Sequence, residues 1–137
     1  MLFPIVTAGY AAILALLFAV LSALVVTSRV RLRVNHGDGG KPILNRLIRA
    51  HANFAEYVPL ILLLVALIEA GGVARGAVHA LLLPLLVVRT LHPIGMLAPE
   101  ASLRQFACRG SAAIVTWLVL IVAAALLLNR ALQGGAW

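Results

Sequence analysis

The chain has 137 residues, of which 64% are apolar, a mean hydropathy of +1.09 and a formal net charge of +7. This composition excludes a soluble globular domain and predicts a single-domain, all-α integral membrane protein. Nucleic acid is excluded as a partner, because the basic residues flank apolar segments and lack interleaved aromatic residues. The positive charge instead indicates membrane orientation, and it also favours anionic lipid headgroups or an anionic ligand as partners.

Four apolar segments predict a bundle of four membrane-spanning helices, since a hydrocarbon core about 30 Å thick needs about 20 helical residues. We expect one domain, residues 1–137, with spans at approximately residues 2–28, 45–69, 75–95 and 111–129. The second span reaches the required length only if it includes the polar residues from about Arg49 onward. Several ionisable side chains are therefore expected at membrane depth.

The basic residues are distributed unevenly around the predicted spans. Eight Lys and Arg residues lie in residues 29–49 and 104–109, next to span ends, whereas only Arg75 and Arg130 lie at the opposite ends. By the positive-inside rule, both basic loops are expected in the cytosol and both termini outside it. The first span lacks a positive N-terminal region and is predicted to be an anchor helix rather than a cleaved signal peptide.

Polar residues of the second span fall on one face. At about 100° per residue, a stripe roughly 80° wide contains Arg46, Arg49, Asn53 and Glu56, whereas His51 points nearly the opposite way. The spacing predicts that the charged members partly neutralise one another. The cluster either binds a ligand or ion, as ionisable groups in membranes often do, or only joins helices and fixes their register.

The third span supplies a second polar set near the same end. Arg89 and His92 are spaced i, i+3, and Arg104 follows beyond the span. Arg89 is alternatively a snorkelling arginine that contacts headgroups, and His92 a polar residue at a helix end. Together with the second span, these residues predict a cationic pocket with one carboxylate. Such a pocket suits a small anion that carries several charges and an amine.

The polar connection contains His36-Gly37-Asp38-Gly39-Gly40, which is typical of a turn. It matches neither a Walker motif nor a dinucleotide-binding fingerprint. His36 and Asp38 offer only two ligands on a loop, so no metal site is predicted. Cys108 is the only cysteine, which excludes an internal disulfide.

The motifs resemble those of the MAPEG superfamily, the membrane-associated proteins in eicosanoid and glutathione metabolism. The resemblance is carried by Val30-Arg31-Leu32-Arg33, Gly37-Asp38-Gly39-Gly40, Arg49-Ala50-His51-x-Asn53-x-x-Glu56 with Pro59, and Arg89-x-x-His92. It is closest to short bacterial members, which are similar to microsomal glutathione transferases and prostaglandin E synthases. It implies a homotrimer with glutathione bound as co-substrate at the cytosolic side between subunits. In a bacterial inner membrane, the orientation expected from the basic residues places both termini in the periplasm.

The resemblance also implies residue roles. The positions that match glutathione-binding positions of the family are Arg31, Asn53, Glu56 and His92, with Glu56 the partner of the glutathione amino group. A supporting role is expected for Arg46, Arg49, His51 and Arg89. Arg104 aligns, over a gap of one residue, with the arginine that stabilises the thiolate in the prostaglandin synthase branch, and is the expected catalytic residue. A guanidinium there favours the thiolate of a thiol whose pKa is about 8.5.

The chain departs from the pattern of the prostaglandin synthase branch at four positions. Ala52 replaces an arginine, Met96 a tyrosine, Gln105 a serine and Cys108 a tyrosine. Three functions are therefore considered: a glutathione-dependent transferase or peroxidase acting on hydrophobic electrophiles, a non-catalytic membrane protein that binds a lipid-like ligand or partner, and a small multidrug-type transporter. The transporter class is disfavoured because residues 1–28 carry no charged side chain.

Overall fold

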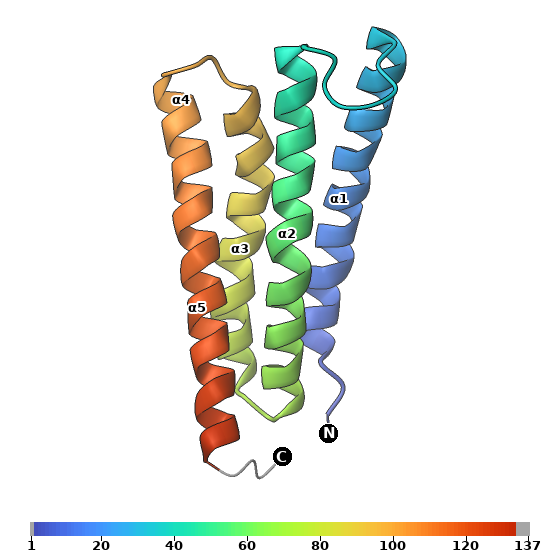
Figure 1. Cartoon of the computed structure of the whole chain (residues 1–137). Helices are drawn as coiled ribbons and strands as arrows, with labels where there is room; N and C mark the ends of the chain where they lie inside the picture. Colours follow the sequence, from blue (N-terminus) through green and yellow to red (C-terminus); the bar gives the residue numbers. More distant parts are fainter. Residues whose placement is uncertain (1, 134–137) are drawn as a thin grey trace.

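The computed structural model describes residues 2–133, which form a bundle of long antiparallel helices (Figure 1). Its elements are α1 (Ile5–Leu32), α2 (Pro42–Ala70), α3 (Arg75–Leu97), α4 (Leu103–Gln105), the π-helical turn η1 (Phe106–Gly110) and α5 (Ser111–Leu132). α4, η1 and α5 run on as one helix, so residues 2–133 contain four helices long and apolar enough to cross a membrane. The predicted all-α, four-span fold is confirmed.

α2 and α3 lie in the middle of the bundle, and α1 and α5 lie on opposite sides of them (Figure 1). Both outer helices contact α2 and α3, but within the described residues they do not contact each other. Apolar side chains from all four spans interlock along the axis. These core residues include Leu14, Leu21, Val58, Ile61, Val65, Val78, Leu82, Leu85, Val119 and Ala123. In a bilayer such helices associate through close packing rather than through exclusion of water.

The two ends of the bundle carry different parts of the chain (Figure 1). The connections at residues 33–41 and 98–102 lie at one end, called the loop end below. The first and last described residues, Leu2 and Gln133, lie at the other, called the terminal end. The basic residues that follow α1 and those that begin the fourth span are therefore at the same end.

Several helices extend beyond the apolar segments that predict them. α1 continues to Leu32, the fourth span begins at Leu103, and α3 continues through Pro93 to Leu97. Apolar residues mark only the part of a helix that lies in hydrocarbon, so a helix can continue beyond them. At the end of α1 the arginines support this continuation, because arginine has a high helix propensity and is favourable near a helix C-terminus. Proline is tolerated inside a membrane helix where neighbouring groups satisfy the freed carbonyl.

The polar connection between α1 and α2 is the turn that the sequence predicts. The Asp38 carboxylate accepts hydrogen bonds from the Gly40 N–H at 2.9 Å and from the Asn45 side-chain amide at 2.8 Å. Gly39 has a φ of +57°, and a Cβ added there would lie 2.6 Å from Val34 Cγ2. Both the positive φ and the close approach require glycine.

Glu69, near the C-terminus of α2, caps the start of α1 at the terminal end. Its carboxylate accepts hydrogen bonds from the Val6 N–H at 2.9 Å, the Thr7 N–H at 2.8 Å and the Thr7 hydroxyl at 2.6 Å. A helix N-terminus has N–H groups without partners inside the helix, and a carboxylate there is also favoured by the helix dipole. The residue is buried, with 7% of its surface exposed. Arg130 of α5 donates a hydrogen bond to the Gly71 carbonyl at the same end.

Candidate functional site

The structure separates Arg46 from the other members of the polar stripe on α2. Arg46 is half-buried, and its Nη2 donates to Glu100 Oε1 at 2.7 Å while its Nη1 donates to the Ala98 carbonyl at 3.1 Å. This is the one ion pair among residues 2–133. Arg46 therefore ties α2 to the connection between α3 and α4, and does not pair with Glu56.

Asn53 bonds to Arg89 of α3. The Arg89 side chain is 2% exposed, and its Nη1 donates to Asn53 Oδ1 at 2.7 Å. The guanidinium carbon lies 5.6 Å from the centre of the Tyr57 ring, which provides a cation–π contact. Arg89 Nε is buried and has no hydrogen-bond partner among residues 2–133. A buried guanidinium with an open donor and no paired carboxylate makes this part of the bundle strongly cationic.

His92 lies one turn beyond Arg89 and is also buried. Gly95 follows after another three residues and is buried as well. The i, i+3 spacing places the three residues along one line on α3, facing the interior of the bundle. Arg89 therefore does not extend to the headgroups as a snorkelling side chain would, and the sequence prediction that Arg89 and His92 share a face is confirmed.

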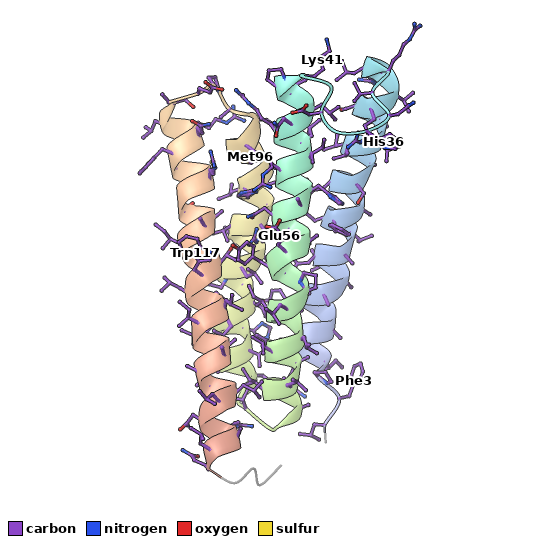
Figure 2. All side chains as sticks on the ribbon, viewed as in Figure 1. Phe3, His36, Lys41, Glu56, Met96 and Trp117 are labelled. Atoms are coloured by element: carbon purple, nitrogen blue, oxygen red, sulfur yellow. The ribbon has the colours of Figure 1, made fainter. Side chains whose placement is uncertain are left out.

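Glu56 lies exposed at the midpoint of the 29-residue α2 (Figure 2). At 1.5 Å per residue, it is about 21 Å from either end of the helix, where the polar half of α2 gives way to its apolar half. Arg49, two turns nearer the loop end, is exposed on the same side of α2. Neither side chain forms a hydrogen bond within residues 2–133. An ionised group on the outer face of a membrane helix is costly in lipid, so this face needs a polar or charged cover.

Two other predicted site residues also point outward at the loop end. Arg31, in the last turn of α1, and Arg104, in the short helix α4, are both exposed. The single chain therefore does not bring Arg31, Arg104 and Glu56 together into one enclosed pocket. It places Arg89 and His92 inside the bundle, with the half-buried Asn53 bonded to Arg89, and leaves Arg31, Arg49, Glu56 and Arg104 exposed.

His51 faces α1 and stands apart from the stripe, as its spacing predicts. Its Nε2 lies 3.0 Å from the Ser22 hydroxyl oxygen, and its ring stacks on Phe18 with centroids 4.6 Å apart. Ser22 also donates to the Phe18 carbonyl at 3.0 Å. These contacts make His51 a supporting residue of the α1–α2 contact.

Gln105, one of the four departures from the family pattern, takes part in the cap of the fourth span. The Ser102 hydroxyl accepts a hydrogen bond from the Gln105 N–H at 3.1 Å, and Gln105 Oε1 accepts one from the Ala101 N–H at 2.9 Å. This reciprocal pattern resembles a capping box. Of the other departures, Ala52, Met96 and Cys108 are half-buried.

An apolar groove of about 310 Å³ runs between α1 and α2. The small residues Ala11, Ala15 and Ala55 open it, and Phe18 and Phe54 form part of its lining. The α2 residues of this lining face α1, as His51 does, whereas Glu56 lies on a different side of α2. The groove can accommodate an apolar chain.

Two features of the structure, one at the loop end and one at the terminal end, were not predicted from sequence. The π-helical turn η1 begins two residues after Arg104 and has no hydropathy signature. The cap formed by Glu69 has only a weak sequence signal. In an antiparallel helix pair, the C-terminus of the second helix lies next to the N-terminus of the first, whose N–H groups lack partners. A carboxylate near the end of the second span, such as Glu69, could therefore be expected to accept from them.

Comparisons with known proteins identify the family. The model of the MAPEG family matches residues 7–129. Inner membrane protein YecN of Escherichia coli strain K12 is 36% identical over 117 residues, which cover 85% of this chain and 86% of that protein. Inner membrane protein YecN of E. coli O6:H1 strain CFT073 gives the same values. With a four-span helical bundle and a family match across nearly all of it, this chain is an integral membrane protein that belongs to the MAPEG family.

Proposed function

We propose that this protein is a homotrimer in a bacterial inner membrane that binds glutathione between subunits at the loop end and transfers it to lipophilic electrophiles. The observation that carries the proposal is Glu56, an exposed carboxylate at the midpoint of a membrane helix. A neighbouring copy would cover this face and remove the carboxylate from lipid. The name of the E. coli relative supports the inner-membrane location, and the basic residues of the loop end support a cytosolic loop end.

The chemistry of the exposed and buried candidates suits glutathione, which carries two carboxylates, an amine and a thiol. Glu56 would accept a hydrogen bond from the amine, and Arg31 would pair with a carboxylate. Asn53 and His92 would bind polar atoms from the interior side, with Arg89 holding Asn53 in place through the 2.7 Å hydrogen bond. Because Arg31 is exposed on α1 and Glu56 on α2, a site between two subunits can use both without a change in the bundle.

Arg104 would then act on the thiol. A guanidinium near the sulfur favours the thiolate, which attacks the electrophile and forms the carbon–sulfur bond while the leaving group departs. The apolar part of the electrophile would reach the thiolate from the bilayer. The protein would contribute orientation and charge stabilisation rather than a covalent intermediate.

Glu56→Gln is expected to weaken glutathione binding by at least tenfold, because the amide cannot pair with the ammonium group as a carboxylate does. Isothermal titration of the purified protein in mild detergent measures the effect. Glu100→Gln is the matched control: it makes the same chemical change at an exposed residue of the loop end whose partner is Arg46. Equal weakening in both variants would contradict the role of Glu56. Absence of saturable binding to wild type at millimolar glutathione would overturn the proposed function.

Cross-linking in mild detergent is expected to produce dimers and trimers and no larger species. The exposed polar face of α2, with Arg49 and Glu56, is costly in lipid until other copies cover it, and the family resemblance implies that the assembly has three copies. Mass measurement of the protein–detergent complex by light scattering provides an independent check. A monomer that binds glutathione would contradict the subunit-interface site but leave the ligand assignment intact.

A second candidate function is supported by the apolar groove between α1 and α2, whose lining offers almost no polar atoms. A non-catalytic protein could hold a lipid-like ligand there. Saturable binding of a fluorescent fatty acid by a preparation that neither binds glutathione nor conjugates a chlorodinitrobenzene-type electrophile would favour this function over the transferase.

A further inference from the structure

Gly95 of α3 packs closely against the fourth span at the loop end. A Cβ added to Gly95 would lie 2.7 Å from the Arg109 backbone nitrogen and 2.9 Å from Cys108 Cβ. Distances under 3.0 Å essentially never occur for a real Cβ, and one of the two atoms belongs to the backbone. Any side chain larger than hydrogen would therefore displace one helix from the other. Glycine is required here because the two helices approach closely, and not because the backbone has a positive φ.

The segment that Gly95 touches is the π-helical turn η1, not regular α-helix. A π turn inserts one extra residue, so the residues before it are rotated by about 100° relative to an uninterrupted α-helix. Such turns are less favourable than α-helix and persist where other contacts hold them. Here the Ser111 hydroxyl donates to the Ala107 carbonyl, and the cap formed by Ser102 and Gln105 holds the helix start just before the turn.

Arg104 lies in α4, directly before η1, and it therefore takes its direction from this turn. In an uninterrupted α-helix, Arg104 would lie over Cys108 and Ser111, at i+4 and i+7. With η1 in place, that alignment is shifted by one residue, and the Arg104 side chain is exposed at the loop end. The orientation of the guanidinium thus depends on a backbone irregularity that α3 holds through Gly95.

We propose that Gly95 is a positioning residue that holds η1 against α3 and so fixes the direction in which Arg104 reaches the thiol of bound glutathione. This inference rests on the proposed function. Gly95 itself does not touch the ligand, and its contribution is to keep the fourth span close enough for the π turn to pack. His92 and Arg89 lie further along the same line of α3 and are expected to retain their contacts with the rest of the ligand.

Gly95→Ala tests the inference, with Gly76→Ala as the matched control. Gly76 lies in the same helix, but a Cβ added there would meet no atom within 4 Å. The readout is the pKa of the bound glutathione thiol, followed through the ultraviolet absorbance of the thiolate as pH is varied. We expect wild type and Gly76→Ala to lower the thiol pKa below its ordinary value of about 8.5. Gly95→Ala is expected to raise the thiol pKa by about one unit relative to wild type, which lowers the thiolate fraction up to tenfold. The affinity for glutathione is expected to stay within about threefold of wild type.

Ser111→Ala provides a second route if Gly95→Ala does not fold. It removes the hydroxyl that bonds to the Ala107 carbonyl without adding volume, so a smaller rise in the thiol pKa is expected. A folded Gly95→Ala or Ser111→Ala protein with the wild-type thiol pKa would overturn the inference while the proposed function stands. A loss of glutathione affinity together with the shift in thiol pKa would show that Gly95 maintains the shape of the whole binding site and not specifically the direction of Arg104, which would also overturn the inference. If wild type does not bind glutathione, the proposed function and this inference fail together.

Discussion

Glu69→Leu is expected to lower the free energy of unfolding by about 3 kcal/mol, because each buried donor left without a partner costs about 1–3 kcal/mol. Three donors lose their acceptor together: the N–H groups of Val6 and Thr7 and the Thr7 hydroxyl. Within hydrocarbon no solvent replaces the lost acceptor, although α1 begins near the terminal end and water would recover part of the loss. Thermal and denaturing-detergent unfolding, followed by circular dichroism, would measure the change.

Two controls separate the cap from the general effect of removing a carboxylate. Thr7→Ala removes only the hydroxyl donor and is expected to cost about 1 kcal/mol. Glu100→Gln breaks an ion pair whose carboxylate side chain is 81% exposed, and such pairs contribute less than about 1 kcal/mol. If Glu69→Leu were no more destabilising than Glu100→Gln, the cap would have little energetic importance. Glutathione binding at the loop end is expected to survive in the folded fraction of Glu69→Leu.

Arg104→Ala is expected to lower kcat for conjugation by about a hundredfold, the usual effect of removing one donor that stabilises a developing or reacting anion. Glutathione affinity should change little, because the other candidate residues bind the carboxylates and the amine. The measurement combines steady-state kinetics with a chlorodinitrobenzene-type electrophile and a separate determination of the glutathione Kd. A fall in kcat with a preserved Kd is the expected signature.

Arg104→Lys should restore part of the lost rate, because it keeps the positive charge but not the planar guanidinium. Arg75→Ala removes an exposed arginine at the start of α3, at the terminal end, and should leave the kinetics unchanged. An Arg104→Ala enzyme with raised KM and unchanged kcat would assign the residue to binding rather than to the thiolate. Arg104→Ala and Gly95→Ala should shift the thiol pKa in the same direction, with the larger shift in Arg104→Ala.

The membrane class, the four spans and the resemblance to the MAPEG superfamily are all readable from the amino-acid sequence. Hydropathy determines which segments can cross a bilayer, since the free energy of moving a segment into lipid depends mainly on its own apolar composition. Helical periodicity also separates His51 from Asn53 correctly, because residues two apart in a helix point in different directions. The contact of His51 with Ser22 and Phe18 and the bond of Asn53 to Arg89 are consistent with that separation.

Tertiary structure alone decides which polar groups become partners. Arg46 pairs with Glu100 and Asn53 with Arg89, 54 and 36 residues away, whereas helical spacing alone suggested contacts within α2. The cap of Glu69 on α1 and the π turn held by Gly95 likewise depend on how helices meet at each end of the bundle. Periodicity specifies a direction around one helix axis, but the neighbour in that direction is determined by packing between helices. Sequence therefore determined the membrane class and the candidate residues, and the tertiary structure decided that Arg89 and His92 face inward while Glu56, Arg31 and Arg104 face outward.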